Sequence, residues 1–203
     1  DVERSRGLGD VYKRQDQEKL GTKLELGANT LTLSVEGYQT AKLTFSYQKA
    51  LELKERDGYT FVHPFDDENV IAGQGTVGLE IMNDLDDIDA IIVPVGGGGL
   101  ISGIAYAVKQ IRPSIKIYGV QSAGAAGMYS SVKNGKIECL DKVQTVADGI
   151  AVKQPGENTF SLVREYVDDI ALVSDDEISS AILALIEKQK MIAEGAGAAS
   201  VAA

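Results

Sequence analysis

Apolar and polar positions alternate with a period of two in the first part of the chain. Within Leu24–Val35, Leu31 and Leu33 fall on one face of a predicted strand region, and threonines fall on the other. A helical pattern follows over Tyr47–Arg56 and should stop near Gly58, because glycine is favoured where a helix ends. The early part of the chain therefore predicts a strand region and one helix.

From residue 58 onward, predicted strands and helices alternate. The continuous apolar run Ala90–Val95 is typical of a strand that is buried on both faces. Alternation of this kind favours an α/β fold with a mainly parallel sheet and flanking helices. The predicted strands are Tyr59–His63, Ala90–Val95, Ile115–Val120 and Ile170–Val173, and the predicted helices are Val70–Leu85, Leu100–Ile111 and Asp175–Met191.

The last predicted helix has a clear beginning and a clear apolar face. Ser174 and Glu177 have the spacing of a capping box, in which each side chain accepts a hydrogen bond from a free backbone amide. An apolar stripe then runs along one side of the helix, through Ile178, Ile182, Leu185 and Ile186 with Ala181 beside it.

The ends of the chain suggest that it is not a whole domain. Residues 1–22 mix charged residues and glycine without periodicity, so we interpret them as a non-native or disordered junction. Residues 23–203 are then a partial enzyme domain. The Ala- and Gly-rich stretch Glu194–Ala203 stops in the middle of its pattern, and we expect the domain to be truncated at both ends.

Composition narrows the class of protein. The chain has 203 residues, of which 44% are hydrophobic and 25% charged, as in soluble globular proteins. Its net charge of −10 opposes binding to nucleic acid, which requires Lys and Arg to neutralise phosphates. No apolar run approaches the roughly 20 residues that span a membrane. The single cysteine, Cys139, has no intrachain partner, so we expect a reducing, cytoplasmic location.

Four consecutive glycines carry the most information about chemistry. Gly96, Gly97, Gly98 and Gly99 join the predicted strand Ala90–Val95 to the helix that begins at Leu100. Glycines leave backbone amides unobstructed, and the start of a helix adds unpaired N–H groups and a positive dipole end. The pattern indicates a phosphate site. The alternative is a tight turn that needs glycine only for its geometry.

The loop does not match the common nucleotide motifs. Ile101 and Ser102 stand where G-x-G-x-x-G would place its last glycine, and Ile104 and Ala105 replace the Lys and Ser/Thr of a P-loop. No lysine is therefore placed to reach a β- or γ-phosphate. A cofactor with a single phosphate suits the loop better than a nucleotide does.

Four stretches together resemble the threonine dehydratase branch of the fold-type II pyridoxal-phosphate enzymes. Val93–Leu100 looks like the family's phosphate loop, and His63–Thr76 is similar to the segment before it. Thr145–Val152 resembles the stretch beside the pyridine ring, and Glu194–Ala198 resembles a late acidic-glycine motif. The resemblance covers residues 58–203.

The resemblance implies pyridoxal 5'-phosphate as cofactor and a small amino acid as substrate. Gly96, Gly97, Gly98, Gly99 and Leu100 would hold the cofactor phosphate through backbone amides, Gly149 would pack beside the ring, and Glu194 would lie near it. The implied reaction converts L-threonine, with L-serine as a second candidate substrate, to a 2-oxo acid and ammonia. This reaction fits isoleucine biosynthesis or threonine catabolism. The resemblance also implies that the full-length enzyme is a homo-oligomer.

The family's Schiff-base lysine is missing from this sequence. It lies in a Ser/Asn-x-Lys-x-Arg-Gly context upstream of the matched stretches, followed by a Ser-x-Gly-Asn loop, and residues 1–58 contain neither. No catalytic residue is therefore assigned, and we expect this chain to be inactive by itself. A non-catalytic cofactor-binding protein remains an alternative.

Serine racemase, or another β-elimination or β-replacement enzyme of the same fold, is the second alternative. The resemblance places Gln121 and Gly127 where serine racemase has acidic metal ligands, so no metal is expected, which favours a dehydratase. We interpret His63 as structural, Cys139 as inert, Asp66–Glu68 as the acidic start of a helix and Asp86–Asp89 as a solvated loop.

Overall fold

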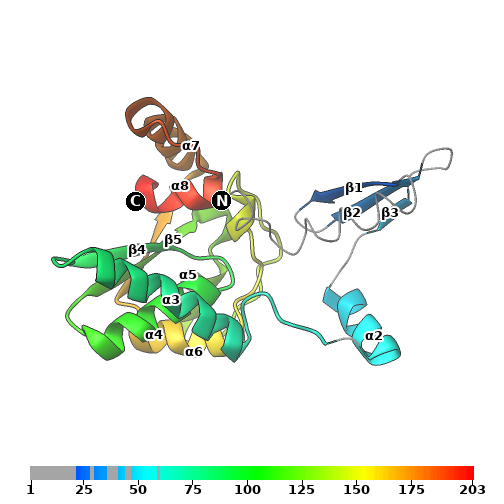
Figure 1. The fold of residues 1–203 in the computed structure, drawn as a ribbon, viewed down its shortest axis with the longest axis horizontal. Helices are drawn as coiled ribbons and strands as arrows, with labels where there is room; N and C mark the ends of the chain where they lie inside the picture. Colours follow the sequence, from blue (N-terminus) through cyan, green and yellow to red (C-terminus); the bar gives the residue numbers. More distant parts are fainter. Residues whose placement is uncertain (1–21, 28–29, 36–40, 44–46, 59) are drawn as a thin grey trace. The chain divides into compact units, whose positions relative to one another are not determined.

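The computed structural model describes residues 22–27, 30–35, 41–43, 47–58 and 60–203. The chain divides into two compact units, Asp1–Phe61 and Val62–Ala203 (Figure 1). Residues 1–21 lie outside the described part, so the interpretation of residues 1–22 as a junction stays a prediction. The partition of the domain at residue 23 is likewise a prediction.

The first unit contains a small antiparallel sheet and one helix. Strands β1 (Thr22–Gly27), β2 (Thr30–Val35) and β3 (Ala41–Leu43) lie side by side in that order. Leu31 pairs with Leu26 of β1 and with Leu43 of β3. Helix α2 (Tyr47–Asp57) ends before Gly58, which has a φ of +73°. The predicted strand region and helix are both confirmed, the former as two strands.

The second unit is built on a three-stranded parallel sheet. Strands β4 (Ala90–Pro94), β5 (Lys116–Ser122) and β6 (Asp169–Val173) are adjacent in the order β4-β5-β6. Because all three run the same way, the segments that follow them leave the sheet at one edge. The α/β fold with a parallel sheet is confirmed.

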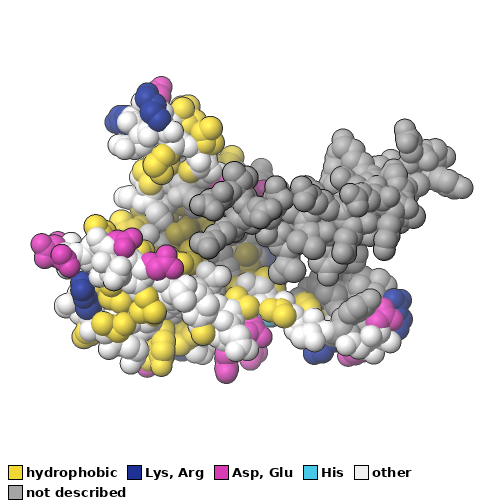
Figure 2. Space-filling model, viewed as in Figure 1, with side chains coloured by type: hydrophobic (Ala, Val, Ile, Leu, Met, Phe, Trp, Pro, Cys, Tyr) yellow, Lys and Arg dark blue, Asp and Glu magenta, His cyan; other side chains and the backbone are white. Residues whose placement is uncertain are grey.

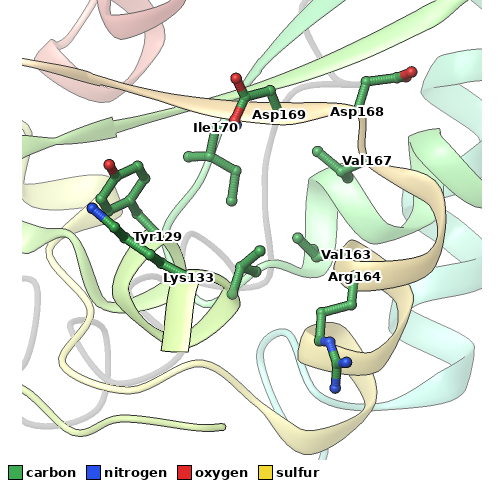
Figure 3. A pocket seen from close by; sticks show the side chains of 9 residues that line it. Tyr129, Lys133, Val163, Arg164, Val167, Asp168, Asp169 and Ile170 are labelled. Carbon is green, nitrogen blue, oxygen red and sulfur yellow. The ribbon is translucent and has the colours of Figure 1, made fainter. Parts of the chain in front are cut away.

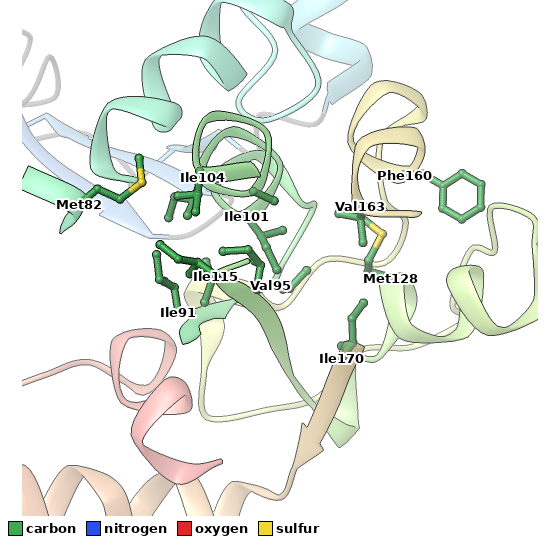
Figure 4. Close-up of a cluster of buried hydrophobic side chains, with 14 residues drawn as sticks. Met82, Ile91, Val95, Ile101, Ile104, Ile115, Met128, Phe160, Val163 and Ile170 are labelled. Atoms are coloured by element: carbon green, nitrogen blue, oxygen red, sulfur yellow. The ribbon is translucent and has the colours of Figure 1, made fainter. Parts of the chain in front are cut away.

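Helices α3 to α6 cover one face of this sheet (Figure 1). A single apolar cluster joins them to β4 and β5, with Ile101, Val108 and Ile117 essentially inaccessible to solvent. The side chains of the cluster interlock between the sheet and the helices (Figure 4). The helices are α3 (Glu68–Asp84), α4 (Gly99–Ile111), α5 (Gly127–Asn134) and α6 (Glu157–Tyr166).

Two further helices, α7 (Asp175–Ala184) and α8 (Gly195–Ala202), cover part of the opposite face. Their cluster includes Val120, Val173 and Ile178 and lies near the carboxyl ends of the strands. Toward the other ends Ile92 is 45% exposed. The expectation that Ala90–Val95 is buried on both faces is therefore wrong for the described residues: burial alternates along the strand because only one face is covered throughout.

Two predicted elements differ from the structure. Residues 60–63 are irregular rather than a strand, because no strand of the described residues pairs with them. Helix α7 keeps its predicted capping box but ends at Ala184. A five-residue π-helical turn, η4 (Leu185–Gln189), follows directly, and Lys190 closes it with a φ of +58°. The predicted helix is therefore two residues longer than the helical stretch, whose last turn is π-helical rather than α-helical. Ile186, at the end of the predicted stripe, is 40% exposed.

The surface of the second unit carries acidic side chains where α3 connects to β4 (Figure 2). Asp86, Asp87 and Asp89 are exposed there, as expected of a solvated loop. None of the helices in the described residues combines the length and the apolar character that crossing a bilayer demands.

Asp168 fastens the start of β6 to its neighbours. Its carboxylate accepts hydrogen bonds from Lys109 Nζ and Lys116 Nζ, each at 2.7 Å, and from the Ile117 amide at 2.9 Å. Burial alone would raise the pKa of Asp168, but these three donors together outweigh it and hold the pKa well below its ordinary value of 3.8.

Replacing Asp168 with Asn should therefore cost stability in a pH-dependent way. A carboxyl whose pKa is lowered on folding stabilises the fold above its unfolded pKa, and the contribution is lost as the pH falls. We expect a loss of about 1–3 kcal/mol in unfolding free energy at pH 7, shrinking below about pH 4. Urea denaturation at pH 7 and pH 3 measures this. Asp169→Asn is the control, and a pH-independent loss would contradict the assignment.

Candidate phosphate site

The glycine loop lies at the edge of the sheet where the strands end. The amide of Val95 donates to Val120 O at 2.8 Å and extends the pairing of β4 with β5 to the last residue before the loop. Gly98 is the N-cap of α4 and has a φ of +98°, a conformation that favours glycine. The chain thus turns, through the glycine loop, from a strand of alternating burial into the start of a buried helix.

The backbone amides of this loop are the main chemical feature of the site. Among the described residues, none of the amides from Gly96 to Leu100 donates a hydrogen bond to a protein acceptor. The amide of Ile101, in the first turn of α4, belongs to the same set, although the sequence analysis did not include it. Gly97, Gly98 and Gly99 are buried. Unpaired donors at a helix N-terminus form a site for an anion.

Close packing accounts for the glycines as well. A Cβ at Gly97 would lie 2.5 Å from the ring of Phe65, and one at Gly98 would lie 2.5 Å from Met128 Cε and 2.9 Å from Thr159 Cβ. The outer side of the loop is therefore filled by side chains, as the tight-turn alternative requires. Packing explains why side chains are absent, and it leaves the unpaired amides unexplained.

The structure brings the other predicted segments to the same place. A Cβ on Gly96 would be 3.1 Å from Ile150 Cα, and one on Gly149 would be 3.2 Å from Glu194 Oε1. Residues 148–150 form a short 3-10 turn, η3 (Asp148–Ile150), and Glu194 is the N-cap of α8. Three stretches that are more than 40 residues apart in the sequence therefore meet at one edge of the sheet.

Asp175 holds the middle one of these stretches in place. In the first turn of α7, its carboxylate accepts hydrogen bonds from Thr145 Oγ1 at 2.6 Å, the Val146 amide at 3.1 Å and Ser122 Oγ at 3.4 Å. Thr145 Oγ1 in turn accepts from the Ala147 amide. The sequence pattern marks Asp175 only as the start of a helix, because its hydrogen-bond partners lie 29 to 53 residues away.

Asp66 differs from its expected role. Asp67 is the N-cap of α3, as the acidic pattern predicts, but the carboxylate of Asp66 caps α6 instead. It accepts from the amides of Glu157, Asn158 and Thr159 at 3.0 to 3.1 Å. The interpretation of Asp66 as part of the α3 acidic turn is corrected, because the chain folds back and brings the start of α6 beside it.

The remaining single residues have structural surroundings. His63 Nδ1 accepts hydrogen bonds from the amides of Phe65 at 3.3 Å and Asp66 at 2.8 Å, which fits the structural role expected for it. Cys139 is exposed. No group of three His, Cys, Asp or Glu side chains within the described residues is arranged to bind a metal ion.

Gln121 is fully buried beneath the site. Its Oε1 accepts from the Tyr129 amide at 2.7 Å, and its Nε2 donates to Val95 O at 3.1 Å and Ala125 O at 3.2 Å. The side chain therefore has backbone partners on both ends and fixes the residue just before the glycine loop.

A cavity of about 330 Å³ lies at the opposite edge of the sheet (Figure 3). Asp169 and Ile170 at the start of β6 line it, together with Tyr129 and Lys133 of α5 and with residues at the end of α6. Because the glycine loop follows the carboxyl end of β4, this cavity is separate from the candidate site. The hydrogen-bonding chemistry, rather than the size of the cavity, identifies the site.

Comparison with known proteins agrees with the resemblance. A family model described as pyridoxal-phosphate dependent enzyme matches residues 11–203. The L-threonine ammonia-lyase of Thermotoga maritima is 52% identical over 158 residues, which are 78% of this chain and 39% of that protein. The resemblance to this family that the four motifs indicated is confirmed.

Solved structures show the same fold. The processed form of threonine deaminase isoform 2 from Solanum lycopersicum is 48% identical with a TM-score of 0.75. The match covers 76% of this chain and 43% of the deaminase chain. Maize serine racemase is 40% identical with a TM-score of 0.73, covering 75% of this chain and 46% of its own. The chain spans less than half the length of each of these relatives.

Replacing Asp175 with Ala should loosen the stretch around Val146. The change removes the acceptor of three hydrogen bonds, so we expect about 1–3 kcal/mol less unfolding free energy. Hydrogen exchange at the Val146 amide should also become faster. Asp176→Ala, at the exposed neighbouring position, is the matched control and should change stability by no more than about 0.5 kcal/mol. Equal effects of the two substitutions would show that Asp175 acts only as a helix-start charge.

Proposed function

The chain belongs to the family of pyridoxal-phosphate-dependent enzymes, and from that premise we propose that a polypeptide containing this chain and the family's lysine deaminates L-threonine. The products are 2-oxobutanoate and ammonia, and L-serine is a second candidate substrate. The observation that carries the proposal is the row of unpaired amides from Gly96 to Leu100 at the start of α4.

These amides suit the phosphate of the cofactor. A phosphate monoester has several acceptor oxygens and a negative charge, and the start of α4 offers several N–H donors and a positive dipole end. No cationic side chain is needed, which agrees with the absence of a P-loop lysine after Gly103. The number and placement of the donors therefore support one phosphate rather than a nucleotide triphosphate.

The surrounding residues would orient the rest of the cofactor. A Cβ on Gly149 would lie 3.0 Å from Ala196 Cβ and 3.2 Å from Glu194 Oε1, so glycine lets residues 148–150 pack closely against the start of α8. The family resemblance puts the pyridine ring beside this backbone. Asp175 keeps this stretch in position through Thr145 and Val146. When bound, pyridoxal phosphate supplies an electron-withdrawing ring that stabilises negative charge on the substrate Cα. This chain's part is to bind and orient it.

The choice of threonine deamination over serine racemisation is supported by Gln121 and Gly127. The resemblance places both where serine racemase has acidic metal ligands. Gln121 has a neutral amide and Gly127 has no side chain, so the two positions offer no carboxylate to a hard divalent cation. Gln121 already uses its side chain on three backbone partners. L-threonine ammonia-lyase is also the printed name of the Thermotoga maritima relative.

Further properties of the enzyme follow the family resemblance. We propose a homo-oligomer in the cytoplasm that binds a small amino acid and neither nucleic acid nor membrane. The strongly acidic net charge of −10 supports the exclusion of nucleic acid. Biosynthetic and catabolic roles are both compatible with the chain.

The phosphate assignment predicts that this chain binds a phosphorylated analogue of the cofactor more tightly than the same analogue without its phosphate. 4'-Deoxypyridoxine phosphate has the phosphate but no aldehyde, so it cannot react with a lysine. We expect it to bind at least roughly tenfold more tightly than 4'-deoxypyridoxine, because only the phosphorylated form engages the loop amides. Equilibrium dialysis gives both dissociation constants. Equal affinities would refute the assignment.

The reaction is tested on the polypeptide that includes the family's lysine. L-Threonine should yield 2-oxobutanoate in equimolar amount with ammonia, detected by chromatography and by an ammonia assay, whereas L-serine should yield no D-serine. Added EDTA should leave the rate unchanged, since the residues at positions 121 and 127 are not acidic. Formation of D-serine in a metal-dependent manner would favour the racemase alternative instead.

A further inference from the structure

The peptide between Gly97 and Gly98 is held by a side chain of another helix. Thr159, fully buried in the first turn of α6, donates a hydrogen bond from Oγ1 to Gly97 O at 2.7 Å. A trans peptide places its C=O and N–H in opposite directions, and the described residues contain no cis peptide. Fixing the Gly97 carbonyl therefore also fixes the direction in which the Gly98 amide points.

Thr159 is itself held from three sides. The Gly156 amide donates to Thr159 Oγ1 at 3.1 Å, and Ser102 Oγ of α4 donates to Thr159 O at 3.3 Å. The Thr159 amide donates to Asp66 at 3.1 Å. Gly156 O, at 3.3 Å, is a second acceptor within reach of the hydroxyl, but Gly97 O at 2.7 Å is the shorter contact. The backbone that carries the hydroxyl therefore has little freedom to shift.

Asp66 adds a second constraint on the start of α6, where Thr159 lies. By accepting from the first three amides of α6, it occupies the N-terminus of that helix with a carboxylate of the chain itself. Next to it, Phe65 packs against the positions of Gly97 and Gly99. One helix start is thus closed to external anions, while that of α4 keeps its amides unpaired.

We propose that Thr159 is a positioning residue for the cofactor phosphate: its hydroxyl locks the Gly97–Gly98 peptide so that the Gly98 amide faces the phosphate oxygens, and Asp66 keeps Thr159 in place. The inference rests on the proposed function, because it takes a phosphate monoester as the ligand of the loop. Thr159 contacts the loop and not the reacting atoms, so it acts only through the Gly98 amide.

Three variants of the chain test this role. Thr159→Val removes the hydroxyl at nearly constant volume, and Thr159→Ser keeps it. Ser131→Ala removes a hydroxyl that is equally buried and bonds to Gly127 O and the Glu138 amide, away from the loop. Melting temperatures of all three show how much of any effect comes from general destabilisation.

Two readouts are needed. The first is the dissociation constant for 4'-deoxypyridoxine phosphate, which should rise at least roughly tenfold in Thr159→Val and less than about threefold in Thr159→Ser and Ser131→Ala. The second is the ¹H–¹⁵N signal and hydrogen-exchange rate of the Gly98 amide without ligand. Both should change in Thr159→Val and return toward the wild-type values in Thr159→Ser.

The outcomes separate the inference from the proposed function. If Thr159→Val binds the phosphate compound as the wild type does and its Gly98 amide is unchanged, the positioning role is overturned. If it weakens binding no more than Ser131→Ala does, the same conclusion holds. If the wild type does not bind the compound but the Gly98 amide still responds to Thr159→Val, the phosphate function fails while the hold of Thr159 on the loop is upheld.

Discussion

Unpaired backbone amides at the start of α4 are the feature on which the account of this chain depends. A buried N–H without an acceptor is costly, and most buried backbone groups in native proteins are paired. Here the amides from Gly96 to Leu100 have no acceptor among the described residues. An anion that accepts hydrogen bonds from these amides would remove this cost, which is why the fold supports our proposal of a phosphate-bearing ligand.

The parallel sheet makes this arrangement possible. Strands that run the same way deliver their following segments to one edge, so the glycine loop after β4 and the Ser122 end of β5 lie near the start of α7. Asp175 ties two of these segments together, and Gln121 ties the end of β4 to α5. The candidate site is thus held by buried and part-buried polar contacts between connections rather than by a deep cavity.

Local patterns in the sequence predicted the features that depend on residues close together in the chain. The Ser174–Glu177 capping box formed as expected, and the glycine loop lies between a strand and a helix as predicted. Contacts between distant residues could not be predicted, because no short-range pattern marks them. Asp66 caps a helix more than 90 residues later, and Thr159 reaches back 62 residues to Gly97.

Other differences have the same origin. A strand needs a partner, and residues 60–63 have none among the described residues, so their apolar character did not make them a strand. The π-helical turn η4 that follows α7 ends at Lys190 in a left-handed conformation, and the apolar stripe did not reveal this end. The family resemblance supplied roles for Gly149 and Glu194 that spacing alone could not give. In the structure Ile150, next to Gly149, lies beside Gly96, and Glu194 lies beside Gly149.

The crystal structure of this chain, from crystals soaked with 4'-deoxypyridoxine phosphate, tests most directly whether the loop amides bind a phosphate. We expect tetrahedral phosphate density within about 2.7–3.2 Å of two or more amide nitrogens between Gly96 and Leu100, the range of ordinary N–H···O hydrogen bonds. Phosphate density elsewhere, for example beside Lys133 in the cavity at the other edge of the sheet, with the loop amides left unpaired, would contradict it.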